Sequence, residues 1–180
     1  MAVFIERLGT AIVWGEASST TVAGGYTTTN TLSLDALADG SGRMGAEVDL
    51  GADHAEEYLV QGAIETGTAP TAGNSFEYYL AWSGDGTNYP AGVTGSDGAW
   101  PADGNEDEWK LQLNAPVTAV IATNDGTTIE IQNAVRVKAK GRYVAPVADN
   151  NLGQALRDEA TASNNGSGLV MWPITRVATS

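Results

Sequence analysis

The residues with the clearest spacing for cation binding lie in one acidic stretch of the chain. Asp103, Asn105 and Asp107 have the spacing of the first three ligands of an EF-hand calcium loop. Such a loop needs Gly at its sixth position and a bidentate Glu at its twelfth, whereas this chain has Glu108 and Asn114 there. The match therefore fails at both diagnostic positions. We favour a solvated acidic loop, with a looser Ca²⁺ site as the alternative.

His54 is the single histidine, and the chain contains no cysteine. Zinc sites and nucleophilic catalysis seldom work with one isolated imidazole and no thiolate. The sequence also contains no G-x-S-x-G motif, no P-loop and no G-x-G-x-x-G motif. We therefore predict no metal and no cofactor, and we interpret His54 as a surface loop residue.

Two carboxylates on predicted strands have the chemistry to hydrolyse a glycosidic bond. A glycosidase needs two carboxyl groups that face one sugar, but Glu77 and Glu130 fall on the outward parity of their strands. The sequence around them supplies no groove rich in Trp and Arg. We interpret both as solvent-facing, and we predict that the protein is not an enzyme and has no catalytic residues.

The five Trp and six Tyr residues could instead bind a sugar by stacking or a protein by packing. The aromatic residues that the predicted strands leave free are Trp14, Tyr79, Tyr89 and Trp100. An exposed aromatic residue in a loop more often packs against protein, so we favour a protein interface over a sugar platform. The candidate interface residues are Val3, Phe4, Ile5, Trp14, Tyr89 and Trp100.

The elements that must position these residues have the pattern of β-strands. The run from Phe76 to Trp82 alternates apolar and polar residues, and a period of two is typical of a half-buried strand. Comparable runs lie at residues 44–50, 58–64, 109–113, 117–122, 129–131, 135–140, 143–147 and 169–172. Asn124-Asp125-Gly126 predicts a hairpin between two of them, and residues 152–160 are the one helix candidate. The sequence therefore predicts an all-β fold, an antiparallel two-sheet jelly-roll β-sandwich.

Two segments interrupt this pattern. Residues 1–42 are weakly patterned, and we interpret them as an extended N-terminal arm or an edge segment. Residues 84–108 are rich in Gly, Pro and acid, and loops longer than about 15 residues in compact domains are usually functional or disordered. The predicted organisation is thus an arm at 1–42 and a jelly-roll sandwich at 43–180, with a long acidic loop at 84–108.

The charge balance limits the partners. Nine basic and 22 acidic residues leave a net charge of −13 at pH 7, which repels a phosphate backbone, so we expect no direct contact with nucleic acid. The acidity suits either solubility or complementarity to a basic patch on a protein. No stretch approaches the ~20 apolar residues of a membrane span, and the first residues lack a basic signal-peptide region. We therefore expect no membrane contact and a soluble chain made in the cytoplasm.

Three passages of the chain carry a resemblance to a known family. They run from Leu32 through a Gly-rich turn to Gly51, from Tyr79 through a Ser-x-Asp-Gly turn to Pro90, and from Gly141 to Leu156 before a last strand ending in Trp172-Pro173-Ile174. This order resembles the small jelly-roll cement or decoration proteins on the capsids of tailed bacteriophages. The resemblance covers most of residues 32–174 and is one of pattern, without a catalytic motif.

The resemblance implies a virion structural protein on the capsid exterior, made in the host cytoplasm. Such a protein binds the outside of the major capsid protein shell, stabilises it, and associates with itself as a homodimer or homotrimer. The alternative is a carbohydrate- or receptor-binding β-sandwich module of a phage head or tail fibre. A glycosidase-like enzyme is the third hypothesis.

Overall fold

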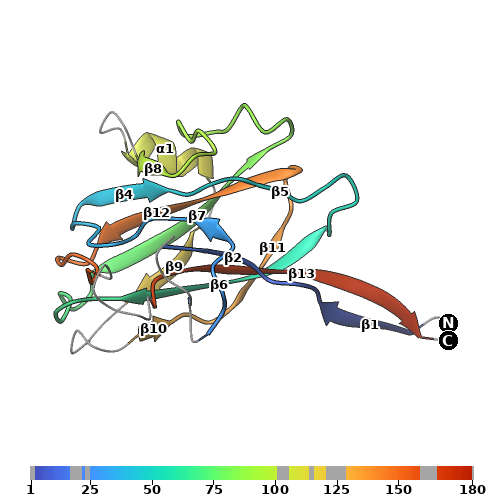
Figure 1. Cartoon of the computed structure of the whole chain (residues 1–180), viewed down its shortest axis with the longest axis horizontal. Helices are drawn as coiled ribbons and strands as arrows, with labels where there is room; N and C mark the ends of the chain where they lie inside the picture. The colour runs from blue at the N-terminus through green and yellow to red at the C-terminus, as the bar shows by residue number, and fades with distance from the viewer. Residues whose placement is uncertain are drawn as a thin grey trace.

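The computed structural model describes residues 3–16, 22, 25–100, 106–113, 116–120, 129–158 and 166–179. These residues form two β-sheets and one short helix (Figure 1). The two sheets lie face to face, and apolar side chains from both fill the space between them. The prediction of an all-β fold with two sheets is confirmed.

The first sheet is built around two long strands. Its order is β10 (Ile129–Ile131), β6 (Glu57–Glu65), β13 (Gly168–Thr179), β2 (Ile12–Gly15) and β3 (Asn30–Thr31). Two further strands join it, β11 (Val135–Lys138) beside β6 and β1 (Val3–Leu8) beside β13. Only the β2–β3 pairing is parallel among the pairings of the described strands.

The second sheet is also antiparallel. Its order is β8 (Gly98–Trp100), β4 (Ser41–Met44), β12 (Tyr143–Asn151), β7 (Ser75–Ser83) and β9 (Val117–Val120), with β5 (Val48–Asp49) beside β12. β9 pairs with β7 and β10 pairs with β6, so the two strands belong to different sheets. The predicted hairpin is therefore wrong, because a local turn signal does not specify whether the chain crosses from one sheet to the other. The turn residues 124–126 lie outside the described part of the chain.

The core between the sheets follows the predicted alternation. Phe76, Tyr78 and Leu80 of β7 point into it and are buried. The Tyr78 hydroxyl donates a 2.7 Å hydrogen bond to the backbone oxygen of Ala63 in β6. This bond joins the two sheets, and it satisfies a phenol that would otherwise be costly to bury.

The helix predicted at residues 152–160 is wrong for its described part, which has no helical turn. The side chain of Asn150 takes the backbone bonds that a helix would use: its oxygen accepts from the Leu152 amide, and its amide donates to the carbonyl oxygens of Leu37 and Gln154. Asn competes with the helix in this way because its side chain resembles a peptide group. Leu152 and Leu156 are instead buried in the core from an irregular segment.

The long loop folds back over the outer face of the second sheet as a third layer, which Figure 1 shows above β4 and β8. Val93 and Leu113 of this layer pack with Tyr79, Trp100 and Val147 of the sheet. The layer includes α1 (Glu106–Leu113), where a strand at 109–113 was predicted. That prediction is wrong. Trp109 and Leu113 share a face in either a strand or a helix, but a strand would place Leu111 on that face as well. Leu111 is 86% exposed, which fits only the helix.

A buried ion pair fastens α1 to the sheet. Asp149 of β12 is fully buried, and its carboxylate lies 2.5 Å from the ammonium group of Lys110. Glu77 of β7 lies on the same face, with its carboxylate 3.9 Å from that ammonium group. The outer face of the second sheet is therefore covered too, by α1 and the residues of the long loop.

We expect the third layer to contribute to the stability of the whole fold. Trp100→Ala should lower the free energy of unfolding by about 3–5 kcal/mol, because it empties a buried site and breaks the 2.8 Å bond from the indole nitrogen to the Ala91 oxygen. Leu111→Ala on exposed α1 is the matched control and should change it by less than about 0.5 kcal/mol. Urea titration monitored by circular dichroism measures both. Equal effects of the two substitutions would contradict a packed third layer.

Candidate functional site

The two ends of the chain pair with each other and leave the body together. β1 and residues 174–179 of β13 form a two-stranded antiparallel unit, which we call the terminal ribbon. Figure 1 shows it projecting beyond the sandwich toward the N- and C-termini. A two-stranded ribbon without a third strand is only marginally stable by itself in water. Its position therefore depends on its junction with the body.

That junction lies at Gly9 and Pro173. The amide of Gly9 donates a 2.8 Å hydrogen bond to the Pro173 oxygen, in the gap between β1 and β2 along β13. Pro has no N–H, so it fits a strand only where the ladder is interrupted. A Cβ on Gly9 would lie 2.7 Å from the Pro173 ring, so the close approach requires Gly. The sequence thus marks where the body ends and the ribbon begins.

The two faces of the ribbon differ in chemistry. Residues directly opposite each other in an antiparallel pair share a face. Ile5 opposite Val177 makes one face apolar, and these side chains are 45% and 43% exposed. Glu6 opposite Arg176 makes the other face charged. The apolar face of the terminal ribbon is therefore partly exposed to solvent.

Four charged residues fasten the charged face of the ribbon to the body. The carboxylate of Glu6 lies 2.6 Å from the guanidinium of Arg136 on β11 and 3.4 Å from that of Arg176. Glu57 of β6 lies 3.1 Å from Arg176 and 3.3 Å from Arg136. Because the Arg136 hydrogen bond stabilises the ionised carboxylate, the pKa of Glu6 is lowered. The same pairing raises the pKa of Arg136.

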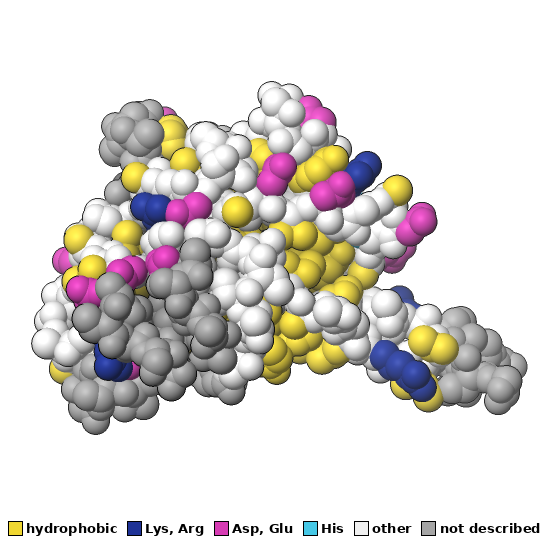
Figure 2. Space-filling model, viewed as in Figure 1, with side chains coloured by type: hydrophobic (Ala, Val, Ile, Leu, Met, Phe, Trp, Pro, Cys, Tyr) yellow, Lys and Arg dark blue, Asp and Glu magenta, His cyan; other side chains and the backbone are white. Residues whose placement is uncertain are grey.

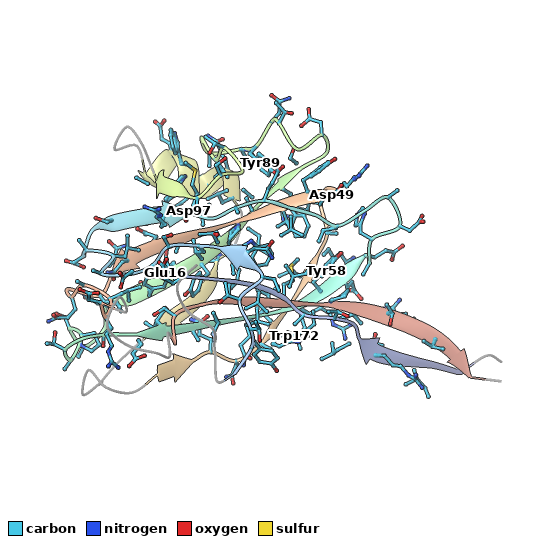
Figure 3. The ribbon with its side chains drawn as sticks, in the orientation of Figure 1. Glu16, Asp49, Tyr58, Tyr89, Asp97 and Trp172 are labelled. Atoms are coloured by element: carbon cyan, nitrogen blue, oxygen red, sulfur yellow. The ribbon has the colours of Figure 1, made fainter. Side chains whose placement is uncertain are left out.

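A cleft of about 680 Å³ opens beside the root of the ribbon, between the ends of the two sheets. We call it the terminal cleft. Its apolar lining consists of Ile12, Val48, Leu50, Ala55, Tyr58 and Ile174. Figure 2 shows this lining as a hydrophobic hollow between the two layers, and Figure 3 shows Asp49 and Tyr58 on its opposite sides. Pockets of about 300–1,000 Å³ are large enough to bury a drug-sized ligand.

Acidic residues surround this cleft. Asp49 is paired with Arg142 at 2.6 Å and accepts the Gly51 amide at 2.8 Å. The Arg142 hydrogen bond and then the Gly51 amide lower the pKa of Asp49 to about 2. Asp53 and Glu56 also line the cleft, and neither forms an ion pair within the described part of the chain. Asp53 and Glu56 therefore give the rim of the cleft negative charge beyond that paired with Arg142 and Arg176.

The candidate interface residues differ in exposure. Val3, Phe4 and Ile5 are all in β1, where Ile5 is exposed and the side chains of the other two lie outside the described part of the chain. Trp14 and Trp100 are buried, so the prediction that their side chains are free to contact a partner is wrong. Trp100 is buried because it lies on β8 of the second sheet, where Ala91, Val93 and Leu113 from either side of β8 in the chain cover it.

Trp14 is buried for a different reason. It lies in the first sheet on β2, and its indole nitrogen donates a 2.8 Å bond to the Ala46 oxygen across the core. Leu32 and Leu34, also from the segment predicted as an arm, are buried beside it. The part of that segment seen to project from the body is β1.

The aromatic residues proposed for sugar stacking do not form an open platform. Tyr79 is 4% exposed, and its hydroxyl donates to the Glu77 carboxylate. Tyr89 is half-buried, and its hydroxyl donates to the Glu47 carboxylate. Burial, and then these hydrogen bonds to carboxylates, raise the pKa of both phenols. With Trp14 and Trp100 buried as well, three of the four side chains are buried, and only Tyr89 is partly exposed.

The residues that suggested metal or acid–base chemistry are dispersed. Asp103 and Asn105 of the EF-hand-like spacing lie outside the described residues, as does the side chain of Glu130. His54 lines the terminal cleft, with its Nδ1 atom 3.0 Å from the Gly51 oxygen. Within the described ranges, no three His, Asp or Glu side chains are grouped to hold a metal ion. No helix of the described chain is both long and apolar enough to span a membrane.

Sequence reasoning missed the C-terminal half of the ribbon. The last strand was predicted to end before Pro173, yet β13 continues to Thr179. Residues 174–179 do not alternate regularly between apolar and polar side chains, although their β-branched Ile, Thr and Val are compatible with a strand. The pairing of the two termini could not be found, because it joins residues at opposite ends of the sequence.

The chain was compared with protein-family models, with curated proteins and with solved structures, and none of the three comparisons found a match. The terminal ribbon and the terminal cleft are therefore interpreted from their own geometry.

We expect acid to loosen the terminal ribbon. The ionised form of Glu6 is the one that pairs, so its lowered pKa adds stability that is fully present above the ordinary value of 4.5 and is lost as the pH falls through the lowered value. The hydrogen-exchange protection of the amides of residues 3–8 should fall about two- to fivefold between pH 7 and pH 3.

The same measurement on Glu6→Gln separates this residue from other acids. The substitution should reduce the protection at pH 7 by a similar factor and make it less dependent on pH. Glu108→Gln, on the exposed side of α1, is the control and should behave as the wild type. Ribbon protection that does not change with pH in the wild type would contradict this role of Glu6.

Proposed function

We propose that this protein is a virion structural protein, a capsid cement or decoration protein with a jelly-roll fold. It binds the outside of the major capsid protein shell of a tailed bacteriophage and stabilises it. Its terminal ribbon is the element that contacts neighbouring subunits. The proposal combines the resemblance of residues 32–174 with the geometry of the two sheets and the ribbon.

The order of the strands supports the jelly-roll part of the proposal. In chain order, β2, β4, β6, β7, β9, β10, β12 and β13 are eight strands of the sandwich. Their antiparallel partners are the first with the eighth, the second with the seventh, the third with the sixth and the fourth with the fifth. This nesting is what results when one long hairpin is rolled up, which is the geometry of a jelly roll.

The single observation that carries the assembly role is the terminal ribbon. It presents the exposed apolar Ile5–Val177 pair on a projecting element. Beyond the body, the outer edge of β1 has no partner strand among the described strands. Unpaired strand edges bind other chains by adding a strand, and natural proteins usually cover them. The uncovered edge and the apolar face of the terminal ribbon therefore favour binding to another chain.

Capsid stabilisation requires no chemistry beyond such contacts. Specific interfaces bury about 1,200–2,000 Å², and many copies on one shell strengthen each other because every bound copy raises the local concentration of contacts. The net charge of −13 suits a surface that faces solvent outside the shell and does not touch packaged DNA. Synthesis in the host cytoplasm and addition to the capsid exterior complete the proposal.

Removal of the first eight residues tests the proposal. The truncation deletes β1 but leaves β2, whose Trp14 belongs to the core. We expect binding to capsids assembled from the major capsid protein of the same phage to fall at least about tenfold, because the apolar pair and the free edge of β1 are lost. Co-sedimentation of purified protein with such capsids measures the occupancy.

A matched control keeps the result specific. Leu111→Ala removes an exposed apolar side chain from α1, away from the ribbon, and should leave occupancy unchanged. The truncated protein should also keep the cooperative unfolding of the body. The proposed function is wrong if the full-length protein does not bind these capsids, and the role of the ribbon is wrong if the truncated protein binds as well as the full chain.

A further inference from the structure

The apolar pair of the terminal ribbon lies beyond the terminal cleft of its own chain. Successive side chains of a strand point to opposite faces. Leu169 and Met171 of β13 point into the core between the sheets, whereas Val170 and Trp172 lie on the outer face of the first sheet. Val177 and its partner Ile5 therefore lie on the side of β13 that faces the core. Because the ribbon is extended and projects from the body, this pair lies past the cleft at its own root and stays exposed (Figure 1).

The terminal cleft has a lining that would receive such a pair. Ile12, Leu50 and Tyr58 give it an apolar floor. The three residues come from different strands or loops of both sheets, so the floor is held by the core and does not need to form on binding. Preformed surfaces lose less conformational entropy when they bind.

Charge complementarity selects the occupant. Asp53 and Glu56 line the cleft and have no ion-pair partner within the described part of the chain. Arg7 lies on the same ribbon face as Ile5, two residues along β1, and it too forms no ion pair with any described residue. One surface therefore offers an apolar pair with one cation, and the other offers an apolar floor with two anions.

We propose that the terminal ribbon of one copy of this chain occupies the terminal cleft of a second copy. The Ile5–Val177 pair covers the apolar floor, and Arg7 lies beside Asp53 and Glu56 of the second copy. This inference rests on the role of the ribbon in the proposed function, and it names the partner of that ribbon. Because every copy carries both surfaces, the contacts form a two-fold exchange, a ring or an open chain of copies.

The first test is the mass of the purified full-length protein by sedimentation velocity. We expect an oligomer at micromolar concentration. Ile5→Asp should weaken the association at least about tenfold, because it places a charge on the apolar floor. The control Leu111→Asp puts the same charge on a more exposed apolar side chain of α1 and should leave the mass unchanged. A monomeric wild type, or an oligomer unaffected by Ile5→Asp, would overturn the proposal.

An exchange of charges between the two surfaces tests the pairing of Arg7 with Asp53 and Glu56 by recovery as well as by loss of association. Arg7→Glu should weaken association about tenfold or more, and so should Asp53→Arg with Glu56→Arg, because each places like charges together. A protein carrying all three substitutions should recover most of the wild-type association. Because recovery of association requires a folded chain, it would exclude misfolding as the cause of the weaker association of the other variants. Failure to recover would contradict the pairing.

The absence of native cysteine allows a direct test of which copy supplies which surface. Under mild oxidation, a mixture of Arg7→Cys protein and Asp53→Cys protein should form a disulfide-linked heterodimer. A mixture of Arg7→Cys and Glu108→Cys proteins should not, because α1 is not part of the cleft. Equal cross-linking in the two mixtures would count against docking in the cleft.

These measurements are independent of the capsid experiment. A chain that associates through the ribbon and cleft but does not bind capsids would retain this inference and remove the proposed function. A chain that binds capsids, yet is monomeric in solution and forms no specific cross-link, would retain the proposed function and remove this inference.

Discussion

The pairing of β13 is the constraint on which the rest of this structure depends. Its first half lies between β6 and β2, where Leu169 and Met171 are buried in the core. Its second half leaves the sheet and pairs only with β1 among the described strands. An extended strand transmits orientation along its length, because its side chains alternate strictly between two faces. The packing of the core therefore determines which face of the terminal ribbon carries the apolar pair, because Val177 lies on the same face of β13 as Leu169 and Met171.

The same strand explains why the two ends of the chain act as one element. β1 has no contact partner other than β13 in the strand pairings of the described chain, and the ion pairs of Glu6 with Arg136 and Arg176 hold it to the body. Exposed ion pairs are individually weak and are screened by salt. The ribbon is thus attached firmly through β13 and loosely through β1, which allows β1 to adjust to a partner.

Much of the sandwich could be predicted from alternation, because burial on one face of a strand leaves a period of two in the sequence. Phe76, Tyr78 and Leu80 were placed correctly for that reason. Tyr79 and Ala81, on the opposite face of the same strand, are buried as well, since the third layer covers that face. Nothing local indicates that a loop rich in Gly and acid will fold back on a sheet. The burial of Trp100 and the helix at 106–113 follow from this long-range contact, so sequence reasoning could not place them.

The candidate site was harder to predict than the core for a related reason. Ile5 was singled out from an apolar patch, and its exposure agrees with a contact role. Its partner Val177 was missed because a proline four residues earlier indicated the end of a strand, whereas Pro173 lies in a gap of the ladder where no N–H is needed. The cleft arises where strands from both sheets end near each other, and no single segment encodes it. Local patterns in the sequence do not reveal surfaces that are built from both termini and both sheets. The side chains that make the two surfaces complementary are Arg7 on the ribbon and Asp53 and Glu56 on the cleft. In the sequence, these three residues look like ordinary surface charges.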